Sequence, residues 1–470
     1  MVMQRIQTKK TLAGLPDVWP DILRPQIKRL LRSNERKIVV LDDDPTGTQT
    51  VYDLPVLTQW SVEILHTELN NDFPAFYILT NSRSLPLSEA YAVNAQIGRN
   101  LTEAARAANR RFVIISRSDS TLRGHFPGEM DALQNALEIQ FDGWLLIPFF
   151  QEGGRITVEN IHYVRQDQWL VPAGESEFAR DPTFGYTSSD LRLWVEEKSA
   201  GQLDAGDVIS ISIDMLRNQG PQAVTERLMQ VEGGQVVVVN AAGYRDLEVF
   251  TDGLLAAEAQ GKTFLYRTAA SFVQVRAGLR PRDLLSSRQL HLPSSGGGLV
   301  VVGSHVPQTT KQLDNLLRQS QMENEEVSAA ALINENHRTT EIDRVVHIVH
   351  QTLKRNENIV IYTSRKALAG QTSEISLKIS RIISEGLIEI VKRIAVTPRY
   401  IIAKGGITSS DIAARGLKVH RAMVVGQILP GVPVWRLGDE SRFPGLAFIV
   451  FPGNVGDDDE LIEVTKKLNQ

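Results

Sequence analysis

Short apolar runs alternate along this chain with longer segments in which apolar residues recur at helical spacing, such as 88–109 and 128–139. Short apolar runs bounded by polar turns are typical of buried strands, and helical spacing indicates amphipathic helices. The alternation predicts an α/β fold with mainly parallel sheets flanked by helices. The expected strands are 38–41, 75–79, 112–115, 143–147, 235–239, 299–302, 358–362, 400–403 and 447–451.

The clearest break in this pattern is the sequence Pro-Ser-Ser-Gly-Gly-Gly at 293–298, which directly precedes a valine-rich run. Its composition is typical of a flexible linker. Because 470 residues are too many for one compact core, we predict two domains, residues 1–293 and 294–470. Residues 160–207 show weak periodicity, and we expect them to form an irregular excursion of the first domain.

Composition narrows the class of protein. The net charge of −4 supplies no positive field for a nucleic acid. The chain has no cysteine, which excludes disulfides, thiolate metal sites and cysteine nucleophiles. No apolar run approaches the roughly 20 residues of a membrane helix, and the first residues lack a signal-peptide core. We therefore expect a cytoplasmic protein that binds neither membranes nor nucleic acids, and homo-oligomerisation remains open.

An acidic turn is the most informative local feature. Three consecutive carboxylates, Asp42 to Asp44, follow the expected strand 38–41, and a Pro-Thr-Gly turn follows them. Like charges this close raise one another's pKa and destabilise the fold, so their presence favours a cationic partner or a proton transfer. The structural alternative is a solvated acidic turn after a core strand.

Three further polar turns, 80–84, 116–124 and 148–157, also follow expected strands. The carboxyl ends of parallel strands line one edge of a sheet, where ligands bind. Arginines at such an edge suit a carboxylate or phosphate, and Ser, Thr and Asp suit sugar hydroxyls. The four turns together predict a site for a small polyhydroxylated anion. Taken singly, their Ser and Thr are more often helix caps, and their arginines are as often in surface ion pairs.

The second half of the chain has glycine-rich turns after its expected strands, at 303–305, 404–411 and 452–457. Glycines there let backbone N–H groups approach phosphate, which suggests a site for a nucleoside triphosphate. None of these turns is a Walker P-loop, and structural turn glycines are the alternative. No ligand spacing for a fixed transition-metal site is present. Mg²⁺ brought in with ATP needs only one or two carboxylates.

Together these motifs resemble the four-carbon acid sugar kinases over nearly the whole chain. The resemblance implies an N-terminal sugar-acid domain and a C-terminal nucleotide domain. It also implies ATP- and Mg²⁺-dependent phosphorylation of threonate-, erythronate- or oxo-tetronate-like acids. The motifs that carry it are 41–48, 80–84, 118–124, 154–157, 177–182, 267–273, 303–304, 405–408, 426–432 and 453–456.

The resemblance also implies roles for individual residues. The implied substrate contacts are Asp43, Asp44, Arg83, Arg117, Ser118, Asp119 and Ser120. The implied ATP contacts are Ser304, Gly405, Gly406, Ile407, Thr408 and Gly453. On this hypothesis Arg83 and Arg117 hold the substrate carboxylate, and Asp43 or Asp44 is the catalytic base.

Two departures from the family pattern bear on the site. Pro45 stands where the family usually has Phe, and Ile407 replaces an acidic residue common in the glycine turn. If that acid helps to hold Mg²⁺ or to orient ATP, its role passes to another residue, such as Asp411 or Asp457.

Two other functions remain open. Asp42-x-Asp44-x-Thr46 also fits the nucleophile loop of haloacid-dehalogenase-like phosphatases. That scheme requires an acidic pair at a later strand end, and the expected strand 235–239 is followed by Asn-Ala-Ala-Gly instead. The other alternative is a non-catalytic sensor of a sugar acid and a nucleotide.

Overall fold

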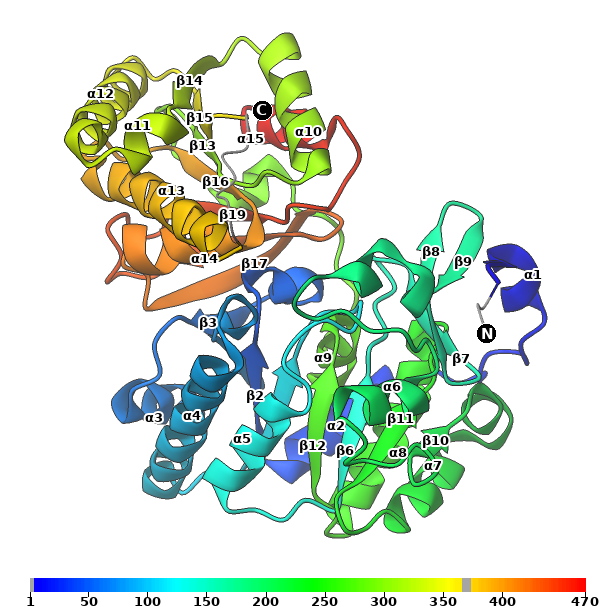
Figure 1. Ribbon diagram of the computed structural model, residues 1–470. Coiled ribbons are helices and arrows are strands. Elements are labelled where there is room, and N and C mark those ends of the chain that lie inside the picture. The colour runs from blue at the N-terminus through cyan, green and yellow to red at the C-terminus, as the bar shows by residue number, and fades with distance from the viewer. Residues whose placement is uncertain (1–3, 366–372) are drawn as a thin grey trace. The chain divides into compact units, whose positions relative to one another are not determined.

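The computed structural model describes residues 4–365 and 373–470, without the side chains of 373–378, 380 and 407. The chain forms two compact units, coloured by residue number in Figure 1. Unit 1 comprises Met1–Val51 and Gln59–Pro281, and unit 2 comprises Tyr52–Thr58 and Arg282–Gln470. The short segment Tyr52–Thr58 therefore leaves unit 1 and contributes to unit 2.

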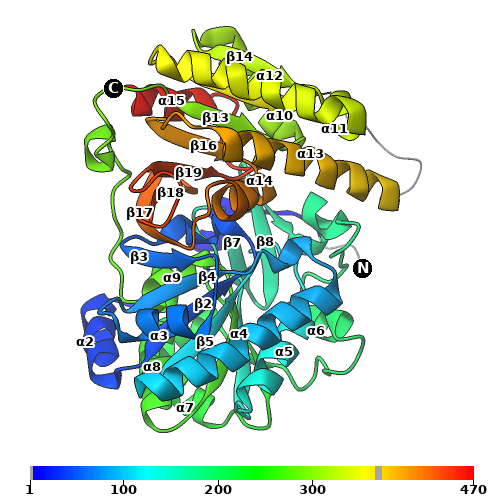
Figure 2. The same cartoon turned by 90° about the vertical axis from the view of Figure 1, so that its left-hand side faces the viewer.

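Unit 1 is built on a parallel sheet. Its strands lie between layers of helices, so both faces are covered and each strand reads as a continuous apolar run. The order across the sheet is β10 (Ile209–Ile211), β11 (Gln235–Val239), β6 (Gly143–Ile147), β12 (Phe264–Thr268), β5 (Phe112–Arg117), β2 (Lys37–Asp42) and β4 (Ala75–Leu79). The helices around it include α2 (Arg24–Asn34), α3 (Val62–Asn70), α4 (Leu87–Ala108), α5 (Gly128–Leu137), α7 (Gly220–Met229), α8 (Tyr244–Ala259) and α9 (Ala270–Arg276) (Figures 1 and 2).

A small antiparallel sheet accompanies the main sheet of unit 1. Its strand order is β1 (Ile6–Gln7), β9 (Trp169–Pro172), β8 (Ile161–Gln166) and β7 (Arg155–Val158). The expectation of an irregular excursion at 160–207 was therefore wrong for β8 and β9, and helix α6 (Leu191–Lys198) follows them. Only alternate residues of β9 are buried, and such a half-buried strand leaves a weaker apolar signal than a core strand.

Unit 2 has a mixed sheet. Its parallel part runs in the order β19 (Ala447–Phe451), β16 (Tyr400–Lys404), β13 (Leu299–Val302), β15 (Ile359–Thr363) and β14 (Glu323–Val327). Antiparallel strands β18 (Val432–Leu437), β17 (Arg421–Leu429) and β3 (Leu54–Leu57) continue it beyond β19. Its helices include α10 (Pro307–Gln319), α11 (Ala329–Ile333), α12 (Glu335–Lys354), α13 (Ser373–Arg393), α14 (Gly406–Asp411) and α15 (Glu460–Leu468).

The α/β class with mainly parallel sheets is confirmed, and every predicted strand is present to within two residues. The chain divides before Arg282, whereas the sequence predicted a boundary after Pro293. Leu285 and Leu290 explain the difference, because both are buried in the core of unit 2 with strands β13 and β18. The Gly-Ser stretch therefore lies inside unit 2. No helix in the described part of the chain is long and apolar enough to cross a membrane.

Candidate functional site

The predicted acidic turn follows β2, an inner strand of the sheet of unit 1. Strand β2 pairs in parallel with β5 on one side and with β4 on the other. The ends of these three strands are therefore neighbours, and they bring Asp42 to Asp44 together with Arg83 and Arg117. This is the convergence that the sequence predicted for the carboxyl edge of a parallel sheet.

Arg83 binds Asp43 in a bidentate manner. Its Nη2 lies 2.5 Å from Oδ1 of Asp43, and its Nε lies 3.2 Å from Oδ2. The hydroxyl of Ser118 donates to Oδ2 at 2.6 Å. Burial alone would raise the pKa of Asp43, but Arg83, with Arg267 and Arg117, lowers it below its usual value. Asp43 is therefore held as a buried carboxylate anion.

Asp42 has a different environment. Its side chain is 1% exposed, and its Oδ1 accepts a hydrogen bond from Nη1 of Arg117 at 3.0 Å. Its Oδ2 is buried without a hydrogen-bond partner. Burial raises the pKa of Asp42 to about 7 despite Arg117. A Cβ on Gly47 would come within 2.0 Å of this carboxylate, so the turn can close over Asp42 only because residue 47 is glycine.

Asp44 is the accessible carboxylate of the three. Its side chain is 21% exposed, and Nη1 of Arg83 lies 3.4 Å from its Oδ2. Its Oδ1 accepts from the backbone N–H of Thr46 at 2.8 Å and so caps the 3-10 helix Pro45–Thr50. Asp44 is thus held in place through one oxygen while the other remains near solvent.

A second ion-pair group follows strand β5. Nε of Arg123 lies 2.6 Å from Oδ2 of Asp119, and Nη1 of Arg123 lies 3.5 Å from Asp181. Burial alone would raise the pKa of Asp119, but Arg123 and Arg83 lower it well below its usual range. Ser120 is buried, and its carbonyl oxygen lies 2.8 Å from Nε2 of His162. The predicted charged residues of unit 1 and Ser118 therefore share one electrostatic network, and Ser120 lies beside it.

Sequence reasoning assigned no role to two members of this network, Arg267 and Glu129, although Arg267 begins one of the motifs of the family resemblance. Arg267 is the penultimate residue of strand β12 and donates to the hydroxyl of Ser116 at 2.8 Å and to the carboxylate of Glu129. Glu129 also accepts from Ser82. Gly124 lies against Arg267 and has φ of +129°. A Cβ added there would come within 2.5 Å of Nη2 of Arg267, so the position requires glycine. The apolar residues at 264–266 could have identified the strand that places Arg267, but Glu129 lies in a helix with no motif of its own.

Arg155, at the start of β7, was also missed as a site residue. Its guanidinium lies 5.5 Å from the centre of the Phe178 ring, and that of Arg123 lies 5.2 Å from the same ring. Nη1 donates to the carbonyl of Gly153, whereas Nε is buried without a partner. Phe178 belongs to the region 160–207, which therefore contributes to the site.

The glycine turns of unit 2 are also brought together. Strand β16 lies between β13 and β19, so Ser304, Gly405 and Gly453 follow three adjacent strands. A Cβ on Gly405 would lie 2.9 Å from Cβ of Ser304, and one on Gly453 would lie 3.2 Å from its Oγ. Gly405 has φ of +117°. Together these three adjacent turns form a glycine cradle, in which Gly405 and Gly453 leave room for the side chain of Ser304.

Gly406, Ile407 and Thr408 form the first turn of α14, directly after Gly405. Thr408 packs against Gly303, which follows strand β13. A Cβ added at Gly303 would lie only 2.5 Å from Oγ1 of Thr408. The side chain of Ile407 lies outside the described residues. Asp411 accepts from the Ser384 hydroxyl at 3.2 Å.

Two cations border the glycine cradle. Lys404 is fully buried, and its Nζ donates to the carbonyl of Pro452 at 2.5 Å and lies 3.9 Å from the centre of the Phe451 ring. Burial lowers the pKa of Lys404 to about 7. Nη1 of Arg365 donates to the carbonyl of Ser304 at 2.8 Å, and its Nε is buried without a partner. Arg365 was not predicted, because it follows strand β15 without a recognisable motif.

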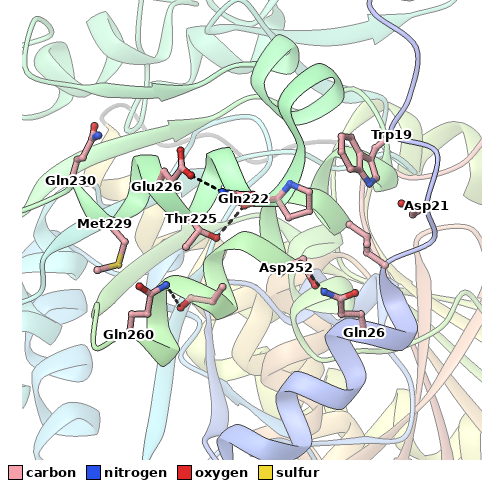
Figure 3. A pocket seen from close by; sticks show the side chains of 13 residues that line it. Trp19, Asp21, Gln26, Gln222, Thr225, Glu226, Met229, Gln230, Asp252 and Gln260 are labelled. Carbon is pink, nitrogen blue, oxygen red and sulfur yellow. Dashed lines mark hydrogen bonds between the residues drawn. The ribbon is translucent and has the colours of Figure 1, made fainter.

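The cavities of unit 1 do not by themselves locate the site. A groove of about 970 Å³ is lined by Trp19, Gln26, Gln222 and Asp252, among others, and contains no predicted site residue (Figure 3). Beside Ser118 lies a cavity of about 10 Å³, which has room for no more than one water molecule. Within residues 4–365 and 373–470, no group of three or more His, Asp or Glu is placed to hold a metal ion.

Comparison with known proteins extends these observations. Residues 38–276 match a family described as a sugar-binding N-terminal domain, and residues 299–461 match one described as a nucleotide-binding C-terminal domain. D-Erythronate kinase of Heliobacterium modesticaldum is 29% identical over 76% of this chain and 77% of its own length. D-Threonate kinase of Salmonella typhimurium is 26% identical over 82% and 86%, respectively. A 3-oxo-tetronate kinase of Pseudomonas fluorescens is 27% identical over 91% and 96%.

Solved structures show the same fold. A Salmonella typhimurium protein described as a tRNA synthase covers 92% of this chain and 99% of its own, with a TM-score of 0.68 and 20% identity. A Haemophilus influenzae protein covers 92% and 100%, with a TM-score of 0.60 and 20% identity. At this identity the likeness concerns the fold alone.

Proposed function

Because the chain belongs to the four-carbon acid sugar kinase family, we propose that it transfers the terminal phosphoryl group of ATP to a hydroxyl of a four-carbon sugar acid. The relatives named as D-erythronate, D-threonate and 3-oxo-tetronate kinases support this substrate class. The observation that carries the proposal is the buried network around Asp43 and Arg83, beside an accessible Asp44.

In the proposed reaction unit 1 binds the acid. Phosphoryl transfer needs positioning and charge neutralisation more than covalent help, and a rigid ion-pair network supplies positioning. Asp44 is the preferred base, since its Oδ2 is near solvent whereas Asp43 is held as an anion by Arg83 and Ser118. Asp43 then acts by orienting Arg83, which is 17% exposed and can reach a ligand.

Arg117 has a different proposed role from the one the family resemblance implies. Its side chain is 5% exposed, and its Nη1 lies 3.0 Å from Asp42 and 4.0 Å from Asp43. A guanidinium engaged in this way stabilises the acidic turn and has little surface left for a ligand. Contact between Arg117 and the substrate stays a prediction.

Unit 2 is proposed to bind the nucleotide. The backbones of Ser304, Gly405 and Gly453 form the phosphate cradle, and Arg365 adds a cation beside Ser304. ATP supplies the phosphoryl group, and Mg²⁺ would neutralise the charge of its phosphates with one or two protein carboxylates. The assignment is supported by Gly405, because the absence of a side chain there lets the backbone approach Ser304 closely.

The phosphatase alternative has less support. Its nucleophile would be Asp42, and a nucleophile must reach the phosphorus atom of its substrate. Asp42 is 1% exposed and lies against Gly47, which leaves no path to a phosphoester. A non-catalytic sensor remains the second alternative, because binding alone would use the same residues.

An assay over stereoisomeric four-carbon acids and their oxo forms tests the proposal. Purified protein is incubated with MgATP and each acid, and ADP and phosphorylated acid are measured by mass spectrometry. We expect both products in equal amounts with at least one acid. Release of phosphate from sugar-acid phosphates without ATP would favour the phosphatase, and binding without turnover would favour the sensor.

A further inference from the structure

Arg155 differs from the other arginines of the unit 1 site. Arg83, Arg117, Arg123 and Arg267 each form an ion pair with at least one carboxylate. Arg155 forms none with any described residue. Its Nη1 donates to the carbonyl of Gly153, its Nε is buried without a partner, and its Nη2 makes no hydrogen bond within the described part of the chain.

Arg155 is partly buried, and its Nε is shielded from solvent. A desolvated guanidinium without a counter-ion destabilises a fold, so its presence indicates an anion that is supplied from outside. The same lack of solvent lowers the pKa of Arg155 below its usual value, because burial disfavours the charged guanidinium. The Phe178 ring, 5.5 Å from the guanidinium, offers partial compensation through its π face. A ring face cannot replace the two hydrogen bonds that a carboxylate would accept.

The surroundings of Arg155 match the rest of the site. Arg123 contacts the same Phe178 ring and is 23% exposed, and its partner Asp181 is 22% exposed. This side of the network is therefore open to solvent. A ligand here would lie within the electrostatic reach of Asp119 and Arg123, both of which act on Arg155.

We infer that Arg155 binds the carboxylate of the sugar acid and so selects acids over neutral sugars. This inference rests on the proposed function, because it names the group of that substrate that the site recognises. It moves the anchoring role from Arg83 and Arg117, whose guanidinium groups are paired with aspartates. Arg117 then supports the acidic turn, Arg83 stays a secondary contact to the ligand, and Arg155 supplies the unpaired positive charge.

Binding without nucleotide tests the inference. Threonate, erythronate, malate and the uncharged tetritols are titrated by calorimetry into wild-type protein and into Arg155→Gln and Arg155→Lys. We expect Arg155→Gln to weaken binding of the acids about 10- to 100-fold, the scale of charged hydrogen bonds. Binding of the tetritols should be unchanged, and Arg155→Lys should retain part of the affinity because it keeps the charge but loses the fork.

A matched control is Arg165→Gln, which removes an exposed arginine from the neighbouring strand β8. It should bind the acids like wild type. The unliganded Arg155→Gln protein should melt at the same temperature as wild type or higher, because an unpaired and partly buried charge is removed. A fall in its melting temperature without ligand would indicate a structural role and overturn the inference.

The two proposals fail separately. If wild type binds the acids more tightly than Arg155→Gln does but transfers no phosphoryl group, the kinase proposal fails and the carboxylate site stands. Equal affinity of wild type and Arg155→Gln for every acid overturns the carboxylate site, even where phosphorylation is observed. Absence of acid binding by wild type overturns it as well.

Discussion

The guanidinium of Arg83 binds both carboxylate oxygens of Asp43, at 2.5 Å and 3.2 Å, while its remaining nitrogen lies 3.4 Å from Asp44. One arginine thus joins two adjacent aspartates in unequal ways. Asp43 is fixed as an anion, and Asp44 keeps an oxygen near solvent. This inequality separates two carboxylates that the sequence presented as equivalent, and it leads to the first prediction.

Asp44→Asn should reduce turnover at least about 100-fold, which is the usual scale of losing a general base. The melting temperature should stay level or rise. Asparagine can still accept from the N–H of Thr46 and cap the 3-10 helix, and the change relieves like-charge crowding. Steady-state kinetics and thermal melts measure both effects.

Asp44→Ala is the informative companion, because it removes the cap as well as the base. It should lose the same activity and, in addition, about 1 kcal/mol of the free energy of unfolding. If Asp44→Asn keeps most of the activity, Asp44 is not the base. If Asp44→Asn unfolds, the acidic turn is chiefly structural.

Gly47→Ala should destabilise unit 1 and disturb the acidic turn. A Cβ at residue 47 would lie 2.0 Å and 2.2 Å from the two oxygens of the buried Asp42 carboxylate. The turn must then shift, with an expected loss of about 1–3 kcal/mol in the free energy of unfolding. Gly243→Ala is the matched control, since a Cβ there would meet nothing within 4 Å. Denaturant unfolding curves that coincide for the two variants would contradict this reading of the turn.

Much of the fold could be predicted because its central strands are continuous apolar runs. Strands β2, β4 and β5 were predicted, and parallel pairing alone is enough to bring Asp43, Arg83 and Arg117 together. Strand β14 was not predicted, because its sequence Glu-Asn-Glu-Glu-Val is that of an exposed edge strand. Strand β3 was missed because four residues of an otherwise N-terminal segment join the sheet of unit 2.

The site was less predictable than the fold, since sequence does not reveal which charges pair. Arg117 and Arg155 look equally available in the sequence, yet Arg117 is paired with Asp42 and Arg155 has no acidic partner among the described residues. That difference depends on distances between segments far apart in the chain. Lys404 stands at a strand end, where a lysine is usually exposed, yet it is fully buried.

The stability contributed by Lys404 should depend on pH. Burial lowers the pKa of Lys404 from 10.5 to about 7. Between these values the unfolded chain binds more protons at this position than the folded chain, so the free energy of unfolding rises with pH. The contribution is fully present above pH 10.5 and is lost as the pH falls through 7.

The measurement is the difference in unfolding free energy between wild type and Lys404→Met, determined from denaturant curves between about pH 6.5 and pH 10. This difference should shift in favour of wild type as the pH rises. Lys466→Met, an exposed lysine in α15, serves as the control and should show a flat difference. A flat difference for Lys404→Met would mean that Lys404 is not titrating in the folded protein within this range.

Gly405→Ala should abolish or strongly weaken nucleotide binding. The backbone has φ of +117° at Gly405, whereas Gly406 begins helix α14. A Cβ on Gly405 would meet Cβ of Ser304 at 2.9 Å, so alanine both strains the backbone and fills the cradle.

Gly445→Ala is the matched control in the same unit, with φ of +72° and nothing within 4 Å of the added Cβ. It should cost stability alone, about 1–2 kcal/mol, and bind ATP normally. Equal ATP affinity of the two variants, measured by calorimetry on folded protein, would place the nucleotide away from this turn.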